Sequence, residues 1–274
     1  IVNLNNQKLL EACLTSIYKN THKISFEITV VDNASTDGSQ KMVRTKFPAV
    51  YLIENKENLG FSRANNLGLK NCQARYALLL NNDTVLKNDA LDKMVAFMDK
   101  SPKVGATGPK LLNVDGTIQH QGGLLGKKFW LAKEPVKVNF VIGAALMVRK
   151  DIIDLVGLLD ENLFFYNEDL DWCIRIRKAG WHVFFLPEPE ITHYSGYSSK
   201  RTFNHRLFIE GFKGGLYFCR KHYGELAYNI YRLLLGLLLL LVLPFQIVNL
   251  VKFKAYLKII MTAWRGQITK PVLK

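Results

Sequence analysis

Apolar, β-branched runs alternate with amphipathic segments along residues 1–100, and this alternation constrains the fold more than any other feature of the chain. Residues 8–19 carry Leu10, Cys13, Leu14 and Ile17 at helical spacing, and residues 26–33 form a short apolar run that ends in a turn. The same rhythm predicts further helices at 39–47, 62–73 and 88–100, and further strands at 49–55 and 76–83. Strands and helices that alternate in this way indicate an α/β domain with a mostly parallel sheet.

The predicted strands end in polar side chains. The ends are Asn3 to Asn6, Asp32 with Asn33, Asn55 with Asn58, and Asn81 to Asp83. Asn and Asp are good turn formers, which explains any one of these ends. Four in succession indicate a single polar cleft, because ligands of such sheets bind beyond the carboxyl ends of the strands. There is no GxGxxG after the first strand and no GxxxxGK[ST], so the motifs do not indicate a dinucleotide or P-loop phosphate site.

The stretch FYNEDLDW at 165–172 places three carboxylates between apolar runs, and basic residues follow it directly. Asp171 and Arg175 have the i,i+4 spacing of a helical salt bridge. Glu168 and Asp169 have no such partner in the local sequence. Their charge must therefore be stabilised by the fold or used in chemistry.

The C-terminal part of the chain is basic and apolar. The 274 residues carry a formal charge of +14, and half of this excess lies in residues 231–274, which contain no acidic residue. Residues 233–251 (LLLGLLLLLVLPFQIVNLV) hold no charge and have about the length of a helix that crosses a hydrocarbon core. Pro244 and Asn249 leave three interpretations open: a spanning helix, a kinked, re-entrant or interfacial helix, and a buried helix hairpin packed on its own domain.

Leucines flanked by lysines indicate contact with an anionic membrane surface and not with nucleic acid. Basic residues on both flanks leave the orientation undecided. We expect the basic cluster in 216–224 (LYFCRKHYG) to face the membrane as well.

The cysteines match neither a metal-binding spacing nor a disulfide framework. Cys13, Cys72, Cys173 and Cys219 are far apart, which indicates reduced thiols and a cytosolic catalytic side. Ile1 already fits a strand, so we expect the native N-terminus to have been trimmed.

Six motifs occur in one order along the chain: VVDNASTDGS (30–39), ENLGFSRANNLGL (57–69), LLLNNDT (78–84), GAALMVRKD (143–151), FYNEDLDWCIRIRKAGW (165–181) and THYSGYS (192–198). In this combination the chain resembles the inverting glycosyltransferases of family 2, which have the GT-A fold. It is most similar to the rhamnosyltransferase-like branch, which uses Asn-x-Asp where other members use Asp-x-Asp. The resemblance covers nearly everything from Ile1 to about Ser199.

The resemblance implies a Rossmann-like domain with helices on both faces of a mostly parallel central sheet, followed here by a C-terminal hydrophobic helical tail. We expect a catalytic domain at 1–200, with a nucleotide-binding half at about 1–100 and an acceptor half at about 101–200. A connecting helical segment at 201–230 and a membrane-associating tail at 231–274 would follow.

The resemblance also implies a donor pocket. Asp32 would accept a hydrogen bond from a pyrimidine base N–H, and Asn33 and Ser35 would extend the pocket, although Asp32 and Ser35 also suit helix capping. Gly60 would let the backbone approach the ligand, and Arg63 would offer its guanidinium to the diphosphate or lie on a surface helix. The other candidates for nucleotide-sugar binding are Asn3, Asn5, Asn58, Asn65, Asn81 and Asn82.

A divalent cation, Mg²⁺ or Mn²⁺, would neutralise the diphosphate leaving group. Asp83 is the expected metal ligand, and His193 resembles a late histidine that joins the metal in the family. Asn81 replaces the first Asp of the usual pair, so the phosphates and water must complete the metal's shell. A lone His after a strand is also commonly structural.

On the acceptor side, the resemblance assigns Asp169 as the base that deprotonates the acceptor hydroxyl. Glu168 would contact the acceptor or raise the pKa of its neighbour. Gly143 and Ala144 would form a wall between the donor sugar and the acceptor. Trp172 would join this wall or belong to the core.

The implied enzyme is a metal-dependent inverting transferase that moves rhamnose or another hexose from a UDP- or dTDP-sugar to a hydroxyl of a lipid-linked or polysaccharide acceptor. It would act in bacterial surface glycan synthesis at the cytoplasmic face of the plasma membrane. One alternative is a polyprenyl-phosphate glycosyltransferase, although such enzymes usually carry several clear spans. Another is a non-catalytic carbohydrate-binding protein, which the joint presence of Asp32, Asp83 and Asp169 argues against. The expected partners are a nucleotide-sugar donor, a glycan or lipid-linked acceptor and an anionic membrane surface. Nucleic acid is not expected as a partner.

Overall fold

The protein is described from a computed structural model, which covers residues 1–122, 128–194, 205–247 and 249–266. The motif expected at 192–198 lies outside the described residues from Ser195 onward. The chain forms two compact units. Residues Ile1–Leu159 and Asp169–Ser198 form the sheet unit, and residues Asp160–Glu168 and Ser199–Lys274 form the helical unit.

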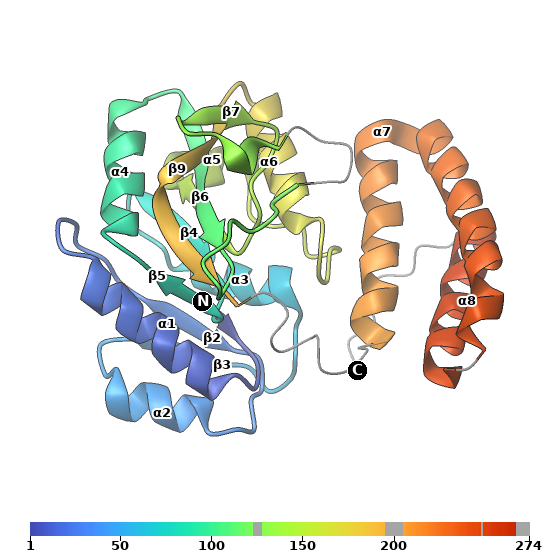
Figure 1. The fold of residues 1–274 in the computed structure, drawn as a ribbon, viewed down its shortest axis with the longest axis horizontal. Coiled ribbons are helices and arrows are strands. Elements are labelled where there is room, and N and C mark those ends of the chain that lie inside the picture. The colour runs from blue at the N-terminus through green and yellow to red at the C-terminus, as the bar shows by residue number, and fades with distance from the viewer. Residues whose placement is uncertain (123–127, 195–204, 248, 267–274) are drawn as a thin grey trace. The chain divides into compact units, whose positions relative to one another are not determined.

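The strands of the sheet unit alternate with helices in its N-terminal half (Figure 1). The strands are β1 (Val2–Asn3), β2 (Thr29–Asp32), β3 (Tyr51–Glu54), β4 (Tyr76–Leu80), β5 (Thr84–Leu86), β6 (Val104–Leu112), β7 (Val136–Val138), β8 (Ala145–Arg149) and β9 (His182–His193). The helices are α1 (Gln7–Asn20), α2 (Ser39–Lys46), α3 (Phe61–Lys70), α4 (Ala90–Lys100), α5 (Lys150–Val156) and α6 (Glu168–Lys178), with the short turn η1 (Phe129–Leu131). The helices and strands predicted between residues 8 and 100 are confirmed as α1 to α4 and β2 to β4.

The strands form one parallel sheet and one mixed sheet. The parallel sheet has the order β1-β2-β3, and the mixed sheet has the order β4-β8-β6-β9-β5, with β7 beside β9. A parallel bridge between Val2 and Asn81 brings the end of β1 next to the end of β4. The α/β fold class is confirmed, and the expected parallel pairing holds for β1, β2 and β3. The prediction is wrong for β4, which pairs antiparallel with β8, and β5 likewise pairs antiparallel with β9. The partners β8 and β9 lie beyond residue 100, outside the stretch whose alternation predicts parallel strands, and β8 with β6 and β9 with β7 are antiparallel as well.

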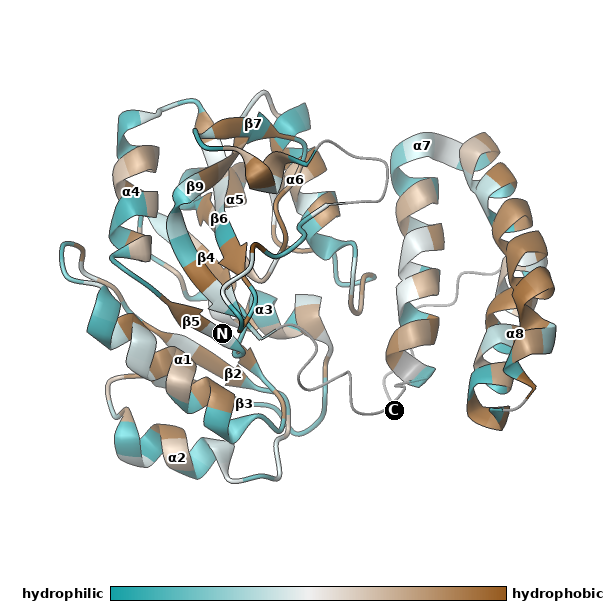
Figure 2. Ribbon diagram, viewed as in Figure 1, coloured by the Kyte–Doolittle hydropathy of each residue, from teal (hydrophilic) through white to brown (hydrophobic). Residues whose placement is uncertain are grey.

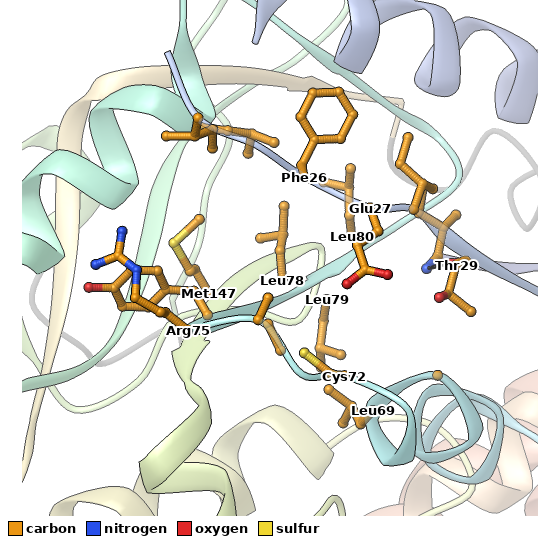
Figure 3. A pocket seen from close by; sticks show the side chains of 18 of the residues that line it. Phe26, Glu27, Thr29, Leu69, Cys72, Arg75, Leu78, Leu79, Leu80 and Met147 are labelled. Carbon is orange, nitrogen blue, oxygen red and sulfur yellow. Dashed lines mark hydrogen bonds between the residues drawn. The ribbon is translucent and has the colours of Figure 1, made fainter. Parts of the chain in front are cut away.

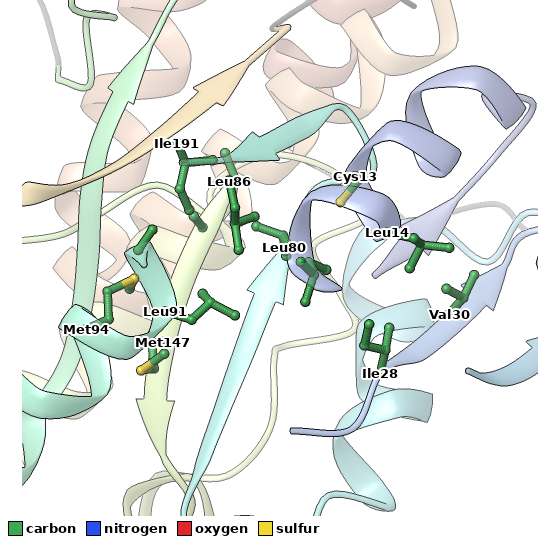
Figure 4. Close-up of a cluster of buried hydrophobic side chains, with 14 of the residues drawn as sticks. Cys13, Leu14, Ile28, Val30, Leu80, Leu86, Leu91, Met94, Met147 and Ile191 are labelled. Carbon is green, nitrogen blue, oxygen red and sulfur yellow. The ribbon is translucent and has the colours of Figure 1, made fainter. Parts of the chain in front are cut away.

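Hydrophobic side chains fill both faces of the mixed sheet. One cluster packs α1, α2 and α4 against the strands, with Leu14, Met94 and Ile191 fully buried (Figure 4). A second cluster packs α3, α5 and α6 against the other face and contains Trp172 and Phe185. Successive residues of β8 alternate between the two clusters, which explains why its sequence is apolar without interruption. Helices thus cover both faces, as expected.

The helical unit contains α7 (His205–Val242), the short turn η2 (Leu243–Gln246) and α8 (Leu250–Arg265). α7 bends at Gly224, whose φ is 83°, a conformation that glycine adopts without steric cost. Asn249 begins α8 by accepting a hydrogen bond from the Lys252 amide. The part of α7 after Gly224 and α8 form a helical hairpin, here called the apolar hairpin, and both are largely hydrophobic (Figure 2).

The apolar hairpin is fixed by contacts between its two helices. Arg232 donates from Nη1 to the carbonyl oxygens of Ala263 and Trp264 at 3.0 and 3.1 Å, and so satisfies the C-terminal end of α8. Gly236 leaves the space that the Trp264 ring occupies, since a Cβ there would lie 2.5 Å from Nε1. The outer leucines remain exposed, including Leu241 at 72%, as does Phe245 at 81%. The segment Leu207–Gln246 is long and apolar enough to cross a membrane, by length and composition only.

Candidate active site

The carboxylate of Asp32 is the centre of a buried polar network at the end of β2. Its Oδ2 accepts a hydrogen bond from Asn3 Nδ2 at 3.0 Å, and its Oδ1 accepts from the Ser35 amide at 2.8 Å and from Gln40 Nε2 at 2.7 Å. The Ser35 hydroxyl in turn accepts from Asn3 Nδ2 and from the Asn5 amide. A carboxylate has about four lone-pair positions, so one position on Oδ2 is left for a further donor.

A second group of amide side chains lies beside this network, between β2, β3 and α3. Asn33 donates from Nδ2 to Asn58 Oδ1 at 3.2 Å and to the Gly60 carbonyl at 3.2 Å. Its Oδ1 accepts from Asn55 Nδ2 at 2.8 Å. Gly60, with a φ of 82° and a ψ of 179°, starts α3 in a conformation that other residues rarely adopt. The Asn ends of two predicted strands, at 26–33 and 49–55, therefore meet here.

The residues after β4 connect these groups. Asn82 donates from Nδ2 to Asn3 Oδ1 at 2.7 Å, and its Oδ1 accepts from Asn6 Nδ2. The backbone N–H of Asn81 donates to the Ala144 carbonyl at 2.9 Å and so connects the end of β4 to the start of β8. The structure thus brings together the ends of β1, β2 and β4.

Asp83 and His193 face each other across β5 and β9. His193 Nε2 lies 3.3 Å from Asp83 Oδ1 and 3.4 Å from Asn81 Nδ2, and both Asp83 and His193 are buried. The pairing follows from the register of the two strands, in which Thr84 lies opposite His193.

Gln119 holds the other ring nitrogen of His193. Its Oε1 lies 2.8 Å from His193 Nδ1, while its Nε2 donates to Asn113 Oδ1 and to the His193 carbonyl. Because both amide hydrogens are used, Oε1 is the acceptor and Nδ1 carries the proton. His193 Nε2 then presents a lone pair towards the Asp83 carboxylate.

Asp83 Oδ1 and His193 Nε2 lie 3.3 Å apart, a separation that matches two ligands of one cation. Two ligands of an octahedral ion, each about 2.1 Å from it, lie about 3 Å apart. Asp83 and His193 therefore fit a divalent cation as a two-ligand site. Among the described residues no group of three or more His, Cys, Asp or Glu side chains could hold a metal ion, so a bound ion would need further ligands from substrate or water.

Asp169 lies at the start of α6 and is enclosed by backbone amides. Its Oδ2 accepts from the Gly143 amide at 2.9 Å, and its Oδ1 accepts from the Leu170 amide at 2.8 Å. Burial raises the pKa of the Asp169 carboxyl above its ordinary value, although these two amides offset part of that effect. A carboxylate with a raised pKa is a better base than an ordinary aspartate.

Gly143 and Ala144 connect this acid to the rest of the site. A Cβ at Gly143 would lie 3.6 Å from both Asp169 Cβ and the Phe61 ring, so the segment fits between the start of α3 and the acid. Ala144 accepts from Asn81, as noted above. The predicted wall therefore lies between the end of β4 and Asp169.

The carboxylates of the 165–172 stretch have different environments. Asp171 is fully buried and accepts from Arg175 Nε at 2.8 Å, so the predicted salt bridge is confirmed. Glu168 belongs to the helical unit and is buried. Tyr166 and Asn167, just before it, both have a φ of 71°, which is uncommon for residues other than glycine and is concentrated at functional sites.

Trp172 and Asn65 make other contacts than expected. Trp172 is fully buried in the core and donates from Nε1 to the Gly157 carbonyl, so the prediction that its ring lines a sugar site is wrong. Asn65 is buried and donates from Nδ2 to the Phe61 carbonyl oxygen within its own helix at 3.0 Å. Arg63 is partly buried in the first turn of α3, where its role towards a diphosphate stays a prediction.

A cavity of about 720 Å³ lies elsewhere in the sheet unit, near the starts of β2 and β4 (Figure 3). It is lined by apolar residues such as Phe26, Leu78 and Met147 and by polar residues such as Glu27, Arg75 and the candidate site residue Asn65. Asp32, Asp83, Asp169 and His193 are not among its lining residues. The cavity is therefore separate from the polar site.

Sequence reasoning missed Gln119 and Gln40. Both hold a site residue through a side-chain contact, and neither lies in one of the six motifs, although Gln40 directly follows the first. A glutamine outside a motif gives no local signal of such a role. Their roles become visible through the fold.

Comparison with known proteins identifies the family. The family model described as Glycosyl transferase family 2 matches residues 1–157. The chain is 28% identical over 228 residues to the N-acetylglucosaminyl-diphospho-decaprenol L-rhamnosyltransferase of Mycobacterium tuberculosis, and the match covers 70% of this chain and 74% of that protein. It is 26% identical to the dTDP-rhamnosyl transferase RfbF of Shigella flexneri, over 62% of this chain and 60% of that protein.

Solved structures show the same fold. The mannosyltransferase PcManGT from Pyrobaculum calidifontis, in complex with GDP-Man and Mn²⁺, is similar with a TM-score of 0.59 at 17% identity, over 97% of this chain and 86% of that chain. At this identity the likeness establishes the GT-A fold and nothing finer. Together with the match to more than half of the sequence, it shows that the chain belongs to glycosyl transferase family 2.

Proposed function

We propose that the protein is an inverting transferase that moves rhamnose or another hexose from a nucleoside-diphosphate donor to an acceptor hydroxyl in bacterial surface glycan synthesis. The observation that carries this proposal is the placement of Asp169, a half-buried carboxylate held by the Gly143 amide, in one network with Asn81 and the strand ends. The mycobacterial and Shigella relatives are both rhamnosyltransferases, which supports the sugar class.

The donor base would bind at Asp32. Its remaining lone-pair position on Oδ2 suits the N–H of uracil or thymine, while Asn3, Ser35 and Gln40 hold the carboxylate in place. Asn33, Asn58 and Gly60 would contact the ribose side of the same ligand. UDP- and dTDP-sugars both present this N–H.

Asp83 and His193 would hold a divalent cation, Mg²⁺ or Mn²⁺. The ion would stabilise the charge that develops on the departing diphosphate. Oxygen ligands suit both ions, and the imidazole favours Mn²⁺. In the protein, Gln119 keeps the lone pair of His193 Nε2 directed at the site.

Asp169 would accept the proton of the acceptor hydroxyl while that oxygen attacks the anomeric carbon. The bond from this carbon to the diphosphate oxygen breaks, and the nucleoside diphosphate leaves. Attack from the face opposite the leaving group inverts the anomeric configuration. A general acid is not required, because diphosphate is already a good leaving group.

The acceptor would be a lipid-linked or polymeric glycan reached at the cytoplasmic face of the membrane. The apolar hairpin supports this, because its exposed leucines are flanked by Lys252, Lys254 and Lys258 and residues 226–274 contain no acidic side chain. A bilayer with anionic lipids complements both properties. A catalytic domain at 1–200, a connection at 201–230 and a membrane tail at 231–274 remain our proposed division.

The transfer reaction is tested with purified protein, Mn²⁺ or Mg²⁺, and a panel of UDP- and dTDP-sugars. A true donor raises the melting temperature in a metal-dependent way, because it binds only the folded state. Release of nucleoside diphosphate with an acceptor glycolipid then establishes transfer. If no donor stabilises the protein and none is cleaved, the enzyme proposal fails.

Membrane contact is tested by sedimentation with vesicles of phosphatidylcholine alone or with phosphatidylglycerol. Replacing the exposed Leu241 and Phe245 by Asp should reduce vesicle binding at least about tenfold, since burying one large apolar side chain contributes about 1.5–3 kcal/mol. Leu155→Asp is the matched control, because Leu155 is 63% exposed on the sheet unit. Equal loss in both variants would contradict a specific role for the apolar hairpin.

A further inference from the structure

The segment Asp160–Glu168, here called the acidic-motif loop, lies within the helical unit and contacts one face of α7. It comprises the first part of the FYNEDLDW stretch and leads directly into Asp169. The contacting residues of α7 are Gly211, Gly214, Tyr217 and Lys221. Their spacing of three to four residues places them on a single side of the helix.

Polar contacts fix the beginning of the loop. Asp160 Oδ2 accepts from the Tyr217 hydroxyl at 2.8 Å and from Lys221 Nζ at 2.7 Å. Asn162 donates from Nδ2 to the Tyr217 oxygen at 3.3 Å and to Asp160 Oδ1 at 2.8 Å. Burial opposes the ionisation of Asp160, but the bonds from Lys221, Asn162 and Tyr217 outweigh it and lower the Asp160 pKa to about 2. The carboxylate is thus charged and fixed at any physiological pH.

Close packing fixes the end of the loop. A Cβ at Gly211 would lie 3.1 Å from Tyr166 Cδ2, and a Cβ at Gly214 would lie 3.5 Å from both Leu163 Cδ2 and the Tyr166 carbonyl oxygen. Glycine in a helix interior is destabilising relative to alanine, because it has more conformational freedom to lose on folding. These two glycines therefore allow Tyr166 and its carbonyl to lie directly against the helix.

We propose that this face of α7 is a positioning surface for the acidic-motif loop, which sets where Glu168 meets the acceptor. The proposal rests on the proposed function for its consequence in catalysis. Lys221, expected to face a membrane, is instead a partner of Asp160. The apolar hairpin continues from α7 and belongs to the same helical unit as the acidic-motif loop. A lipid surface that binds the hairpin therefore binds the unit that carries this loop. The acceptor class that matches this arrangement is a glycan attached to a lipid.

The loop itself is measured by hydrogen exchange of the full-length protein. Lys221→Met and Tyr217→Phe should each speed amide exchange in residues 160–168 and leave exchange in residues 30–35 unchanged. Lys221→Arg should restore protection, because it keeps a charged donor. Unchanged exchange in the loop would overturn the proposal whether or not the protein transfers sugar, so this measurement separates it from the proposed function.

The catalytic consequence is measured with the donor identified by thermal stabilisation. Lys221→Met should lower kcat/KM for the acceptor at least about tenfold and change donor affinity less than twofold. Arg220→Met is the matched control, because Arg220 is the neighbouring basic residue and pairs with Glu225 on the surface. An equal loss in Arg220→Met, or a parallel loss of donor affinity, would overturn the positioning role.

A glycine pair gives a second, independent test. Gly211→Ala and Gly215→Ala both raise helix propensity, but only the first places a methyl group against Tyr166; the second faces the Tyr231 hydroxyl at 3.4 Å. Gly211→Ala should lower the acceptor kcat/KM while Gly215→Ala leaves it unchanged. Equal behaviour of the two variants would contradict a role for this face.

Discussion

Replacing Asp169 by Asn tests the assignment of the base with the least change in shape. The carboxylate is enclosed, with the Gly143 amide 2.9 Å from Oδ2 and the Leu170 amide 2.8 Å from Oδ1. Asparagine keeps the size of the side chain and one of these two acceptors. It cannot accept a proton from a hydroxyl.

The expected loss of transfer is about 10²–10⁴-fold, the usual contribution of a positioned base. At 1.36 kcal/mol per factor of ten, this raises the barrier by about 3–5 kcal/mol. Stability should change much less. One amide would face the new NH₂ group and lose its hydrogen bond, at a cost of about 1–3 kcal/mol, while removal of a buried charge offsets that cost.

The assay is acceptor-dependent release of nucleoside diphosphate, with donor affinity measured by calorimetry and stability by thermal unfolding. Donor affinity should change less than about threefold, because Asp32 and the Asn side chains around it are untouched. Asp151→Asn is the matched control: Asp151 is exposed, starts α5, and accepts from the Ile152 amide at 2.9 Å as Asp169 accepts from Leu170. Transfer within a factor of three of wild type, or a loss of donor affinity as large as the loss of transfer, would refute the assignment.

Three further predictions concern pH, His193 and packing. Asp169 acts as a base in its ionised form, and burial raises its pKa. The value of kcat/KM should therefore fall as the pH falls through a midpoint above the ordinary aspartate pKa of about 3.9. A pH profile in which kcat/KM does not fall on the acid side would contradict this. Gln119→Leu should remove the preference of His193 for the Nδ1–H tautomer, which ¹⁵N NMR of the metal-free protein measures, because Gln119 Oε1 no longer accepts from Nδ1. The same variant should weaken Mn²⁺ binding about 10–100-fold. An unchanged NMR spectrum would contradict the role of Gln119. Gly108→Ala should lower the free energy of unfolding by about 1–3 kcal/mol, because its Cβ would lie 2.6 Å from Val141 Cβ. Gly68→Ala in α3 should be neutral or stabilising, because its Cβ would make only ordinary contacts and alanine favours a helix. Denaturant titration of both variants distinguishes the two cases.

The N-terminal elements could be predicted because their signals are local. The buried positions of α1, Leu10, Cys13, Leu14 and Ile17, repeat at helical spacing in the sequence, and β2 is a continuous β-branched run. The antiparallel strands β5, β7 and β8 were not predicted as such. Their partners lie far along the chain, as with Leu78 opposite Met147, and local pattern carries no record of a distant partner.

The candidate site was predictable in its residue types and only partly in its arrangement. Polar residues at the ends of parallel strands meet because such ends share an edge, and Asn3, Asp32 and Asn82 do meet. Trp172 shows the limit of this reasoning. An aromatic side chain next to an acidic motif suits a sugar site and a core equally well, and only its complete burial distinguishes the two.

The sequence by itself determined the α/β class, the order of the motifs and the membership of the family, because these depend on residue type and on short-range periodicity. The tertiary structure decided which atoms meet: Gln119 with His193, Gly143 with Asp169, and the acidic-motif loop with α7. The apolar run likewise became a hairpin only through Arg232 and Gly236 meeting the end of α8. Such contacts join residues separated by tens of positions, and their geometry is fixed by packing of the whole chain, which local pattern does not encode.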